Sequence, residues 1–274
     1  MNELLNSTNE QAASTAFSKQ APVFDELYAA DAIIKYKRKR VRNHVLQYLK
    51  PGSNILELNA GTGDDAIFFA RQGHRVHATD ISDTMQKMLK EKVRLNDLQG
   101  SITNELCSYT ELKKLFNRGP YDFIFSNFAG LNCTVQLANV LQSFDPLLKR
   151  GGLVTLVILP RFCLWEFLLV FRGKFKTAFR RFSGKKGSRA HIEGQFFRCW
   201  YYNPSFIKNC LENSFDTISI EGLCTIVPPS YIEKFAEKHP RAYRFLQKKE
   251  DRWKGLWPWK SIGDYYIITL QKKN

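Results

Sequence analysis

The stretch Asn54-Ile-Leu-Glu-Leu-Asn-Ala-Gly-Thr-Gly-Asp-Asp-Ala66 decides the fold of this chain. Residues 54–58 are apolar at their centre apart from Glu57, which predicts a short buried strand. Two glycines then predict a tight turn, and a helix begins at Asp64. A second predicted strand over 75–79 ends on Asp80. This order is typical of a parallel sheet whose glycine turn holds a nucleotide-type cofactor.

The charges around the turn narrow the kind of cofactor. In dinucleotide sites the helix N-terminus stays open for a pyrophosphate. Here Asp64 and Asp65 stand at that position, and a further acid, Glu57, precedes the glycines. Carboxylates at a helix N-terminus repel a phosphate. A cationic ligand that carries a ribose is therefore favoured, although Gly61 and Gly63 alone are also compatible with an ordinary tight turn.

The run Glu57-Leu-Asn-Ala-Gly61-Thr-Gly63 resembles motif I of the class I S-adenosylmethionine-dependent methyltransferases. Asp80, about twenty residues further on, resembles their ribose-binding acid; its alternative role is to cap the following helix. The resemblance implies S-adenosylmethionine as cofactor and S-adenosylhomocysteine as product, with Glu57 directed towards the methionyl amine. The family usually has glycine where this chain has Asn59. Because Asn tolerates positive φ better than other side chains, we expect the turn to be kept.

The resemblance places the remaining cofactor contacts at later strand ends. For the adenine the family uses the end of the third strand, here near Cys107 and Ser108, where its usual acid is absent; a surface loop is the alternative. After the fourth strand, Ser126-Asn-Phe-Ala-Gly-Leu-Asn132 resembles small-molecule methyltransferases of the ubiquinone/menaquinone- and biotin-pathway type. The expected cofactor contacts are Glu57, Asn59, Ala60, Gly61, Gly63, Asp80, Ile81, Met85, Cys107, Ser108, Asn127 and Phe128.

The acceptor should lie beside the segment that follows the fourth strand, because ligands bind at the carboxyl ends of parallel strands. The expected acceptor contacts are Phe128, Leu131, Asn132, Arg161 and Trp165. Methyl transfer from a sulfonium mainly requires alignment and the exclusion of water. If the acceptor must lose a proton, His191 and Tyr28 are candidate bases, although a lone His is more often structural. We expect no metal, since the acid cluster of a magnesium-dependent enzyme is absent from the sequence pattern.

Strands and helices alternate along most of the chain. This pattern predicts an α/β, Rossmann-like fold with helices on both faces of a mostly parallel sheet. By resemblance the sheet has seven strands, with the last one antiparallel. Helices are predicted over 16–27, 31–49, 64–72, 82–96, 134–148 and 203–213, and strands over 54–58, 75–79, 102–106, 121–126, 153–159, 217–227 and 264–271.

The chain is predicted to be a single methyltransferase domain over 1–274. Residues 1–50 are expected to form an N-terminal helical lid, within which residues 1 to about 16 are polar and expected to be mobile. A basic aromatic insertion over 161–200 and a C-terminal helical elaboration over 228–262 are expected to extend the sheet. No repeat or low-complexity linker suggests a second domain.

Bulk composition adds constraints on partners and compartment. The net charge of +15 and the pI near 9.6 imply attraction to an anionic partner: nucleic acid, an acidic membrane face or an acidic substrate. The six cysteines are scattered without a C-x-x-C pair, which favours reduced thiols in a cytoplasmic protein. No apolar run reaches the ~20 residues needed to span a bilayer. We expect a soluble protein, peripheral at most to the inner face of a membrane.

The insertion carries a second signal. Phe171, Phe175, Phe179 and Phe182 recur at helical spacing, and residues 161–200 contain ten Lys or Arg against two Glu. This pattern indicates a helix on anionic lipid or a wall over a hydrophobic substrate, while single-stranded RNA and a plain solvated face are alternatives. Gly173 interrupts the predicted helix. The predicted function is methyl transfer to a small, apolar or lipid-like acceptor; the alternatives are an RNA methyltransferase and a non-catalytic cofactor-binding scaffold, with nucleic acid the less favoured partner.

Overall fold

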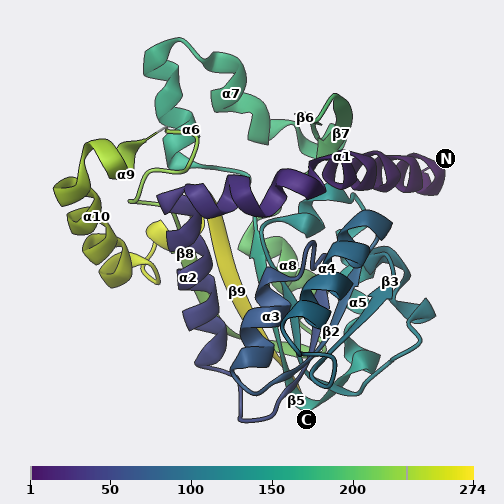
Figure 1. Ribbon diagram of the computed structural model, residues 1–274. Coiled ribbons are helices and arrows are strands. Elements are labelled where there is room, and N and C mark those ends of the chain that lie inside the picture. The colour runs from purple at the N-terminus through teal and green to yellow at the C-terminus, as the bar shows by residue number, and fades with distance from the viewer. Residues whose placement is uncertain (1, 233) are drawn as a thin grey trace.

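The structure, a computed structural model, describes residues 2–232 and 234–274, but not the side chains of residues 2–7, 24 and 27–30. One sheet dominates it, with strands in the order β3-β2-β1-β4-β5-β9-β8 (Figure 1). Its strands are β1 (Asn54–Leu58), β2 (Arg75–Asp80), β3 (Ile102–Leu106), β4 (Tyr121–Ser126), β5 (Leu148–Ile158), β8 (Phe215–Leu223) and β9 (Tyr265–Lys272).

The strand directions confirm the predicted fold. β1 pairs in parallel with β2 and β4, β2 with β3, and β4 with β5. The last strand, β9, lies between β5 and β8 and is antiparallel to both. The carboxyl ends of the five parallel strands therefore meet at one edge of the sheet, which is the edge where α/β proteins bind ligands.

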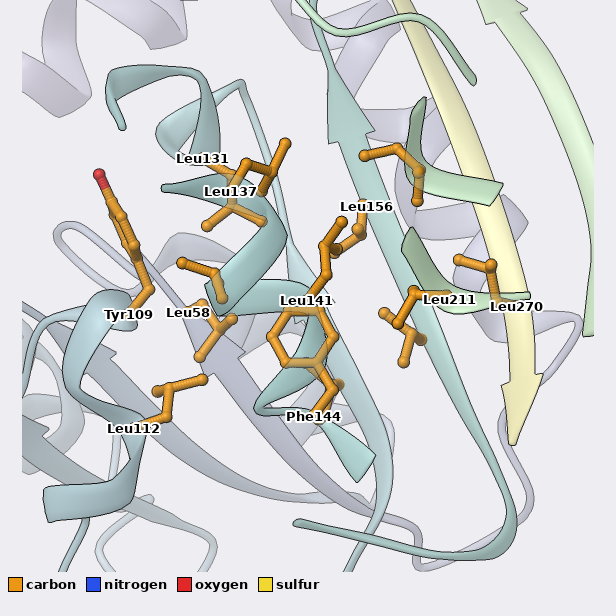
Figure 2. Close-up of a cluster of buried hydrophobic side chains, with 14 of the residues drawn as sticks. Leu58, Tyr109, Leu112, Leu131, Leu137, Leu141, Phe144, Leu156, Leu211 and Leu270 are labelled. Carbon is orange, nitrogen blue, oxygen red and sulfur yellow. The ribbon is translucent and has the colours of Figure 1, made fainter. Parts of the chain in front are cut away.

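Alternating side chains along the strands build two hydrophobic cores, one on each face of the sheet. In β1, for example, Leu56 and Leu58 belong to one core and Ile55 to the other. The first core also receives α5 (Leu137–Gln142) and α8 (Pro204–Leu211), as Figure 2 shows for Leu141 and Leu211. The second core is covered by α2 (Ala32–Leu46), α3 (Asp64–Arg71) and α4 (Asp83–Leu95). Glu57 lies on the face that these three helices cover.

Two predictions about helices are wrong. The helix predicted over 16–27 is longer than expected: α1 (Asn2–Ala30) also includes residues 2–15 and crosses above the strand ends (Figure 1). Ala13 and Ala16 are buried against the rest of the protein, so their small side chains allow close helix packing. The single helix predicted over 134–148 is reduced to α5, followed by the short 3-10 helix η3 (Asp145–Leu147) and an early start of β5.

The insertion is not one helix. It consists of α6 (Leu164–Leu168), η4 (Leu169–Arg172), α7 (Phe175–Phe179), η5 (Arg180–Phe182), η6 (Gly184–Lys186) and a hairpin of β6 (Ser188–Ile192) and β7 (Gln195–Cys199). Gly173 breaks the helix as predicted: its φ of +70° is the left-handed conformation of a helix terminator. The hairpin was not predicted.

Arg181 fixes the insertion to the sheet. Its side chain is 2% exposed, and its guanidinium donates to Glu166 Oε1 (2.6 Å), Asp264 Oδ1 (2.9 Å) and two backbone carbonyl oxygens. Arg180 also pairs with Glu166. A buried ion pair with this many hydrogen bonds holds one geometry, so the insertion has a rigid base.

The C-terminal elaboration contains α9 (Phe235–Lys238), α10 (Pro240–Trp253) and η7 (Trp259–Ser261). Glu250 of α10 is fully buried and accepts the backbone N–H groups of Cys224, Thr225, Ile226 and Val227, each at 2.9 Å. These four residues form a concave backbone turn that binds an anion, here supplied by the chain itself.

Candidate functional site

A pocket lies at the carboxyl ends of β1, β2 and β4, beneath α1. It has a volume of about 150 Å³, which is small beside the ~300–1,000 Å³ of typical ligand pockets. Its lining residues are Glu10, Ala13, Ser14, Phe17, Arg38, Glu57, Asn59, Ala60, Gly61, Thr62, Asp64, Asp65, Asp80, Ile81, Met85, Tyr109, Asn127, Phe128, Gly130 and Cys133. Most of the residues expected to contact the cofactor therefore share one pocket. Three of them, Gly63, Cys107 and Ser108, are not in its lining.

Glu57 is the chemically unusual residue of the pocket. It is 3% exposed, and its Oε2 atom has no hydrogen-bond partner within the described part of the chain. Burial raises the pKa of this carboxyl well above its usual value, and the nearby Asp65 raises it further, while Arg42 and Arg38 lower it. A buried carboxylate oxygen without a partner is costly, and an ammonium group would satisfy it. Glu57 therefore fits the methionyl amine of S-adenosylmethionine.

Asp80 organises the glycine turn. Its Oδ2 accepts from Gly61 N at 2.9 Å and its Oδ1 from Ser82 N at 2.8 Å. Burial raises the pKa of Asp80, and these backbone donors act in the opposite direction. Ser82, rather than Asp80, caps α4, because its hydroxyl accepts from Met85 N. Each Asp80 oxygen retains a lone pair, so the carboxylate can also accept hydrogen bonds from ribose hydroxyls.

Asn59 adopts the positive φ that the turn requires, at +46°. Its side chain joins the turn to the segment after β4: it donates to Asn127 O at 2.9 Å and accepts from Ser126 Oγ at 2.6 Å. Gly130 makes room for it, since a Cβ atom at position 130 would lie 2.3 Å from Asn59 Cγ. The family usually has glycine at position 59. This chain accommodates the larger Asn59 because position 130 is a glycine.

We expect Gly130→Ala to lower the free energy of unfolding by about 1–3 kcal/mol, because the new methyl group overlaps the Asn59 amide. Asn59→Gly in the same chain should restore most of the loss. Urea unfolding of the two single variants and the double variant measures this coupling. Gly100→Ala is the matched control, since its Cβ would meet nothing within 4 Å. Additive effects of the two substitutions would contradict the contact.

The segment after β4 is held in a strained conformation. Phe128 and Ala129 have φ values of +47° and +62°, which is uncommon for residues with side chains. Asn127 Nδ2 donates to Asp65 Oδ2 at 2.7 Å, and Asn127 Oδ1 accepts from Phe128 N at 2.8 Å. The guanidinium carbon of Arg38 lies over the ring of Phe128, 5.3 Å from the ring centroid. Backbone strain of this kind is common where a ligand is positioned.

The carboxylates at the start of α3 are not free to repel a ligand, as the sequence interpretation assumed. Asp64 pairs with Arg38 and with Lys92, and Asp65 accepts from Arg42 Nε at 2.6 Å. Burial raises the pKa of Asp64, but Arg38 and Lys92 outweigh it and hold that pKa below its usual value. The argument for a cationic ligand therefore rests on Glu57 and not on these two residues. Their basic partners were missed, although Arg38 and Arg42 lie four residues apart on one helix.

The N-terminal helix forms one wall of the pocket. Glu10 is 5% exposed and accepts from the hydroxyls of Ser108 and Thr110, both at 2.9 Å. Ser18 and Ser82 share a hydroxyl hydrogen bond of 2.6 Å, and Asp25 pairs with Lys92. Ser108, predicted near the adenine, is thus engaged by α1. The sequence signal that could have revealed this wall is Ala13, Ala16 and Phe17 at helical spacing.

Of the residues expected to contact the acceptor, the structure places some at the pocket and others elsewhere. Phe128 lines the pocket. Leu131 is part of the hydrophobic core, and the Asn132 amide is bonded to the backbone of Leu159 and Trp200, so that both hold the fold. Arg161 is exposed and Trp165 is half-buried in α6; neither lines the pocket.

Of the two candidate bases, only His191 has a described side chain, and it does not lie at the pocket. His191 is exposed on β6, where its ring lies 4.4 Å from that of Phe196, and it is not in the lining. The side chain of Tyr28 lies outside the described residues.

One group of side chains has the spacing of metal ligands, among the residues described: Cys163, Glu166 and Asp264. Both carboxylates are paired with Arg181. The guanidinium supplies the positive charge that a cation would bring, so this cluster serves as an anchor. The described residues also contain no helix long and apolar enough to cross a membrane.

Comparison with known proteins identifies the domain. Residues 55–152 match a family model described as "Methyltransferase domain". Over 151 residues the chain is 27% identical to demethylmenaquinone methyltransferase of Listeria welshimeri. That alignment covers 54% of this chain and 62% of the relative, so the chain spans somewhat less than two thirds of the relative's length.

Solved structures share the whole fold. One is 1,6-didemethyltoxoflavin-N1-methyltransferase of Burkholderia thailandensis with bound S-adenosylhomocysteine, at a TM-score of 0.56 and 14% identity, covering 96% of this chain and 88% of that chain. Another is geranyl diphosphate C-methyltransferase of Streptomyces coelicolor, at a TM-score of 0.58 and 12% identity, covering 91% and 84%. Residues 55–152 are thus a methyltransferase domain, and the chain as a whole has the fold of these solved methyltransferases.

Proposed function

We propose that this protein transfers the methyl group of S-adenosylmethionine to a small, apolar acceptor of quinone-like or lipid-like character. The observation that carries the proposal is the buried, unpartnered Glu57 oxygen in the same pocket as Asp80. Glu57 suits an ammonium group and Asp80 suits ribose hydroxyls. S-adenosylmethionine carries both groups, so the two carboxylates would bind different parts of the same ligand.

The chain's own residues position and shield the reacting groups. The cofactor supplies an electrophilic methyl group on a sulfonium when it is bound. Phe17 and Phe128 give the pocket aromatic walls, and Ala13 and Ala60 add small apolar surfaces to its lining. Such walls exclude water and favour an apolar acceptor. The strained segment after β4 brings Asn127 and Phe128 to the strand ends, which supports a role for them in aligning the acceptor.

The relatives support the same class of acceptor. A demethylmenaquinone methyltransferase acts on a quinone by its name. The region that matches the methyltransferase domain, residues 55–152, includes the glycine turn and the segment after β4. Geranyl diphosphate C-methyltransferase is named for an isoprenoid acceptor. The high net charge favours an RNA acceptor as the alternative, because a basic surface attracts phosphates.

The test is to incubate the protein with methyl-labelled S-adenosylmethionine and either a lipid extract or total RNA. We expect label in the organic-soluble fraction, and Glu57→Gln should abolish it because that variant binds the donor weakly. Label in RNA that disappears at high salt would favour the alternative. Donor binding without label in any fraction would support a non-catalytic scaffold and contradict the proposal.

A further inference from the structure

The insertion exposes a cluster of phenylalanines. Phe171 is 84% exposed, and Phe175, Phe179 and Phe182 are each more than half exposed. Phe167 and Leu168 of α6 add partly exposed apolar surface. Exposed apolar clusters of this size on a soluble domain generally mark a surface that meets lipid or a partner.

Three rings of this cluster contact one another. Phe167 and Phe179 are T-shaped, with centroids 6.3 Å apart, and Phe179 and Phe182 are tilted by 45° at 6.2 Å. Phe167, Phe179 and Phe182 therefore form a continuous apolar surface, beside which Phe171 and Phe175 stand exposed, and such a surface suits insertion between lipids.

Cations surround the phenylalanines. Arg172, Lys174 and Lys176 are exposed, and within residues 2–232 and 234–274 none of them forms an ion pair. Arg180 and Arg181 differ, because Glu166 binds both. The three free cations are therefore available to the anionic headgroups of a membrane surface, which attract basic residues close to apolar anchors.

A cleft between the insertion and the segment around α9 adds a place for a headgroup. Its volume is about 780 Å³. Arg172 and Lys174 line it on one side and Lys238 and His239 on the other, with Leu169 and Phe235 as apolar wall residues. None of its described lining residues is acidic. Positive charge next to apolar surface matches the phosphate and upper chain of a phospholipid.

The position of the insertion in the fold gives the surface an orientation. β5 ends at Ile158 and leads directly into α6, so the insertion rises from the edge of the sheet that holds the cofactor pocket. In Figure 1 the segment between α6 and α7 projects beyond the rest of the molecule on the side of α1. The Arg181 anchor makes its base rigid.

We propose that residues 164–186 dock the enzyme on an anionic phospholipid bilayer, with the phenylalanines in the interface and a lipid phosphate in the cleft. This inference goes beyond the proposed methyl transfer and does not rest on it. Docking in this orientation turns the pocket edge towards the lipid, where an apolar acceptor would be dissolved.

Co-sedimentation with vesicles tests the proposal. The full chain should sediment with phosphatidylcholine vesicles that contain about one third phosphatidylglycerol, and should remain in solution with phosphatidylcholine alone. Phe171→Ser with Phe175→Ser should lower the bound fraction about tenfold, because both side chains are exposed and bury little in the folded protein. Arg172→Gln with Lys174→Gln should give a similar loss and less dependence on salt.

Matched controls lie on the connection between β3 and β4. Phe116 is 96% exposed, and Lys113 is exposed without an ion pair among the described residues. Phe116→Ser with Lys113→Gln should leave vesicle binding unchanged, and all variants should keep the wild-type calorimetric affinity for S-adenosylmethionine. Failure of the wild type to sediment with anionic vesicles would overturn the proposal. So would full binding by the double Phe variant, or salt-sensitive RNA binding that replaces vesicle binding.

Discussion

Glu57→Gln is expected to lower the affinity for S-adenosylmethionine about 100-fold, or about 2.8 kcal/mol. The substitution keeps the shape of the side chain and removes its negative charge, so the ammonium loses its ionic partner. Because the Glu57 oxygen is buried and otherwise unpartnered, water cannot replace the lost interaction. Isothermal calorimetry measures the loss directly. Glu91→Gln on the exposed face of α4 is the control and should bind normally.

The same substitution should stabilise the ligand-free protein at neutral pH. The pKa of Glu57 is raised in the folded chain, so the ionised carboxylate is disfavoured by folding. Its penalty is present above the folded pKa and disappears as the pH falls to the unfolded value of about 4.5. Glu57→Gln removes the penalty, and its free energy of unfolding should exceed that of the wild type at pH 7 and converge with it in acid.

Binding should show the complementary pH dependence. Affinity for S-adenosylmethionine should fall as the pH is lowered through the raised pKa of Glu57, because the protonated acid has no charge to offer. In Glu57→Gln this part of the pH dependence should vanish. Equal affinity of both proteins at neutral pH would contradict the assignment of Glu57 to the cofactor.

The largest effect on stability is expected for Glu250→Ala. The variant leaves the backbone N–H groups of residues 224–227 without their acceptor in a buried turn. It also leaves Tyr36 and Arg40 without this partner. Removing one member of a buried charged network typically costs about 3–5 kcal/mol, and urea unfolding should show a loss of that size.

Asp251→Ala provides the contrast for this prediction. Asp251 pairs with the same Arg40 from the next position of α10, but its side chain is 58% exposed. A solvent-exposed ion pair contributes at most about 1 kcal/mol, so this variant should be nearly as stable as the wild type. Equal losses in the two variants would show that the backbone turn does not depend on the buried carboxylate.

Local sequence patterns were enough to predict the strands that short apolar segments and neighbouring turn residues define. The bounds of β1, β3 and β4 agree with the prediction because apolar β-formers are bordered there by turn residues. The hairpin of β6 and β7 was not predicted because its strands are only five residues long and largely exposed, so that few buried apolar residues mark them. Its turn is Glu193-Gly194, with both φ values positive, instead of the more common Asn-Gly or Asp-Gly.

Side-chain roles set by distant contacts could not be predicted in this way. The amide of Asn132 reads as a ligand group in sequence, yet its partners lie 27 and 68 residues further along the chain. The charges at Asp64 and Asp65 depend on basic residues of α2 and α4. By contrast Glu57 was identified correctly as an unusual residue, because an acid inside an apolar strand is improbable without a special purpose. Its role towards the cofactor remains a prediction.

The placement of α1 over the pocket affects the rate at which cofactor and product can exchange. The 150 Å³ cavity must widen before a ligand of ordinary size can enter, and side-chain contacts that include those of Glu10, Ser18 and Asp25 hold α1 in place as one wall. Each exchange of spent for fresh cofactor then requires the contacts of Glu10, Ser18 and Asp25 to break and re-form. We therefore expect the residence time of the product to follow the stability of this helix on the sheet. Turnover can be limited by that step even when methyl transfer itself is fast.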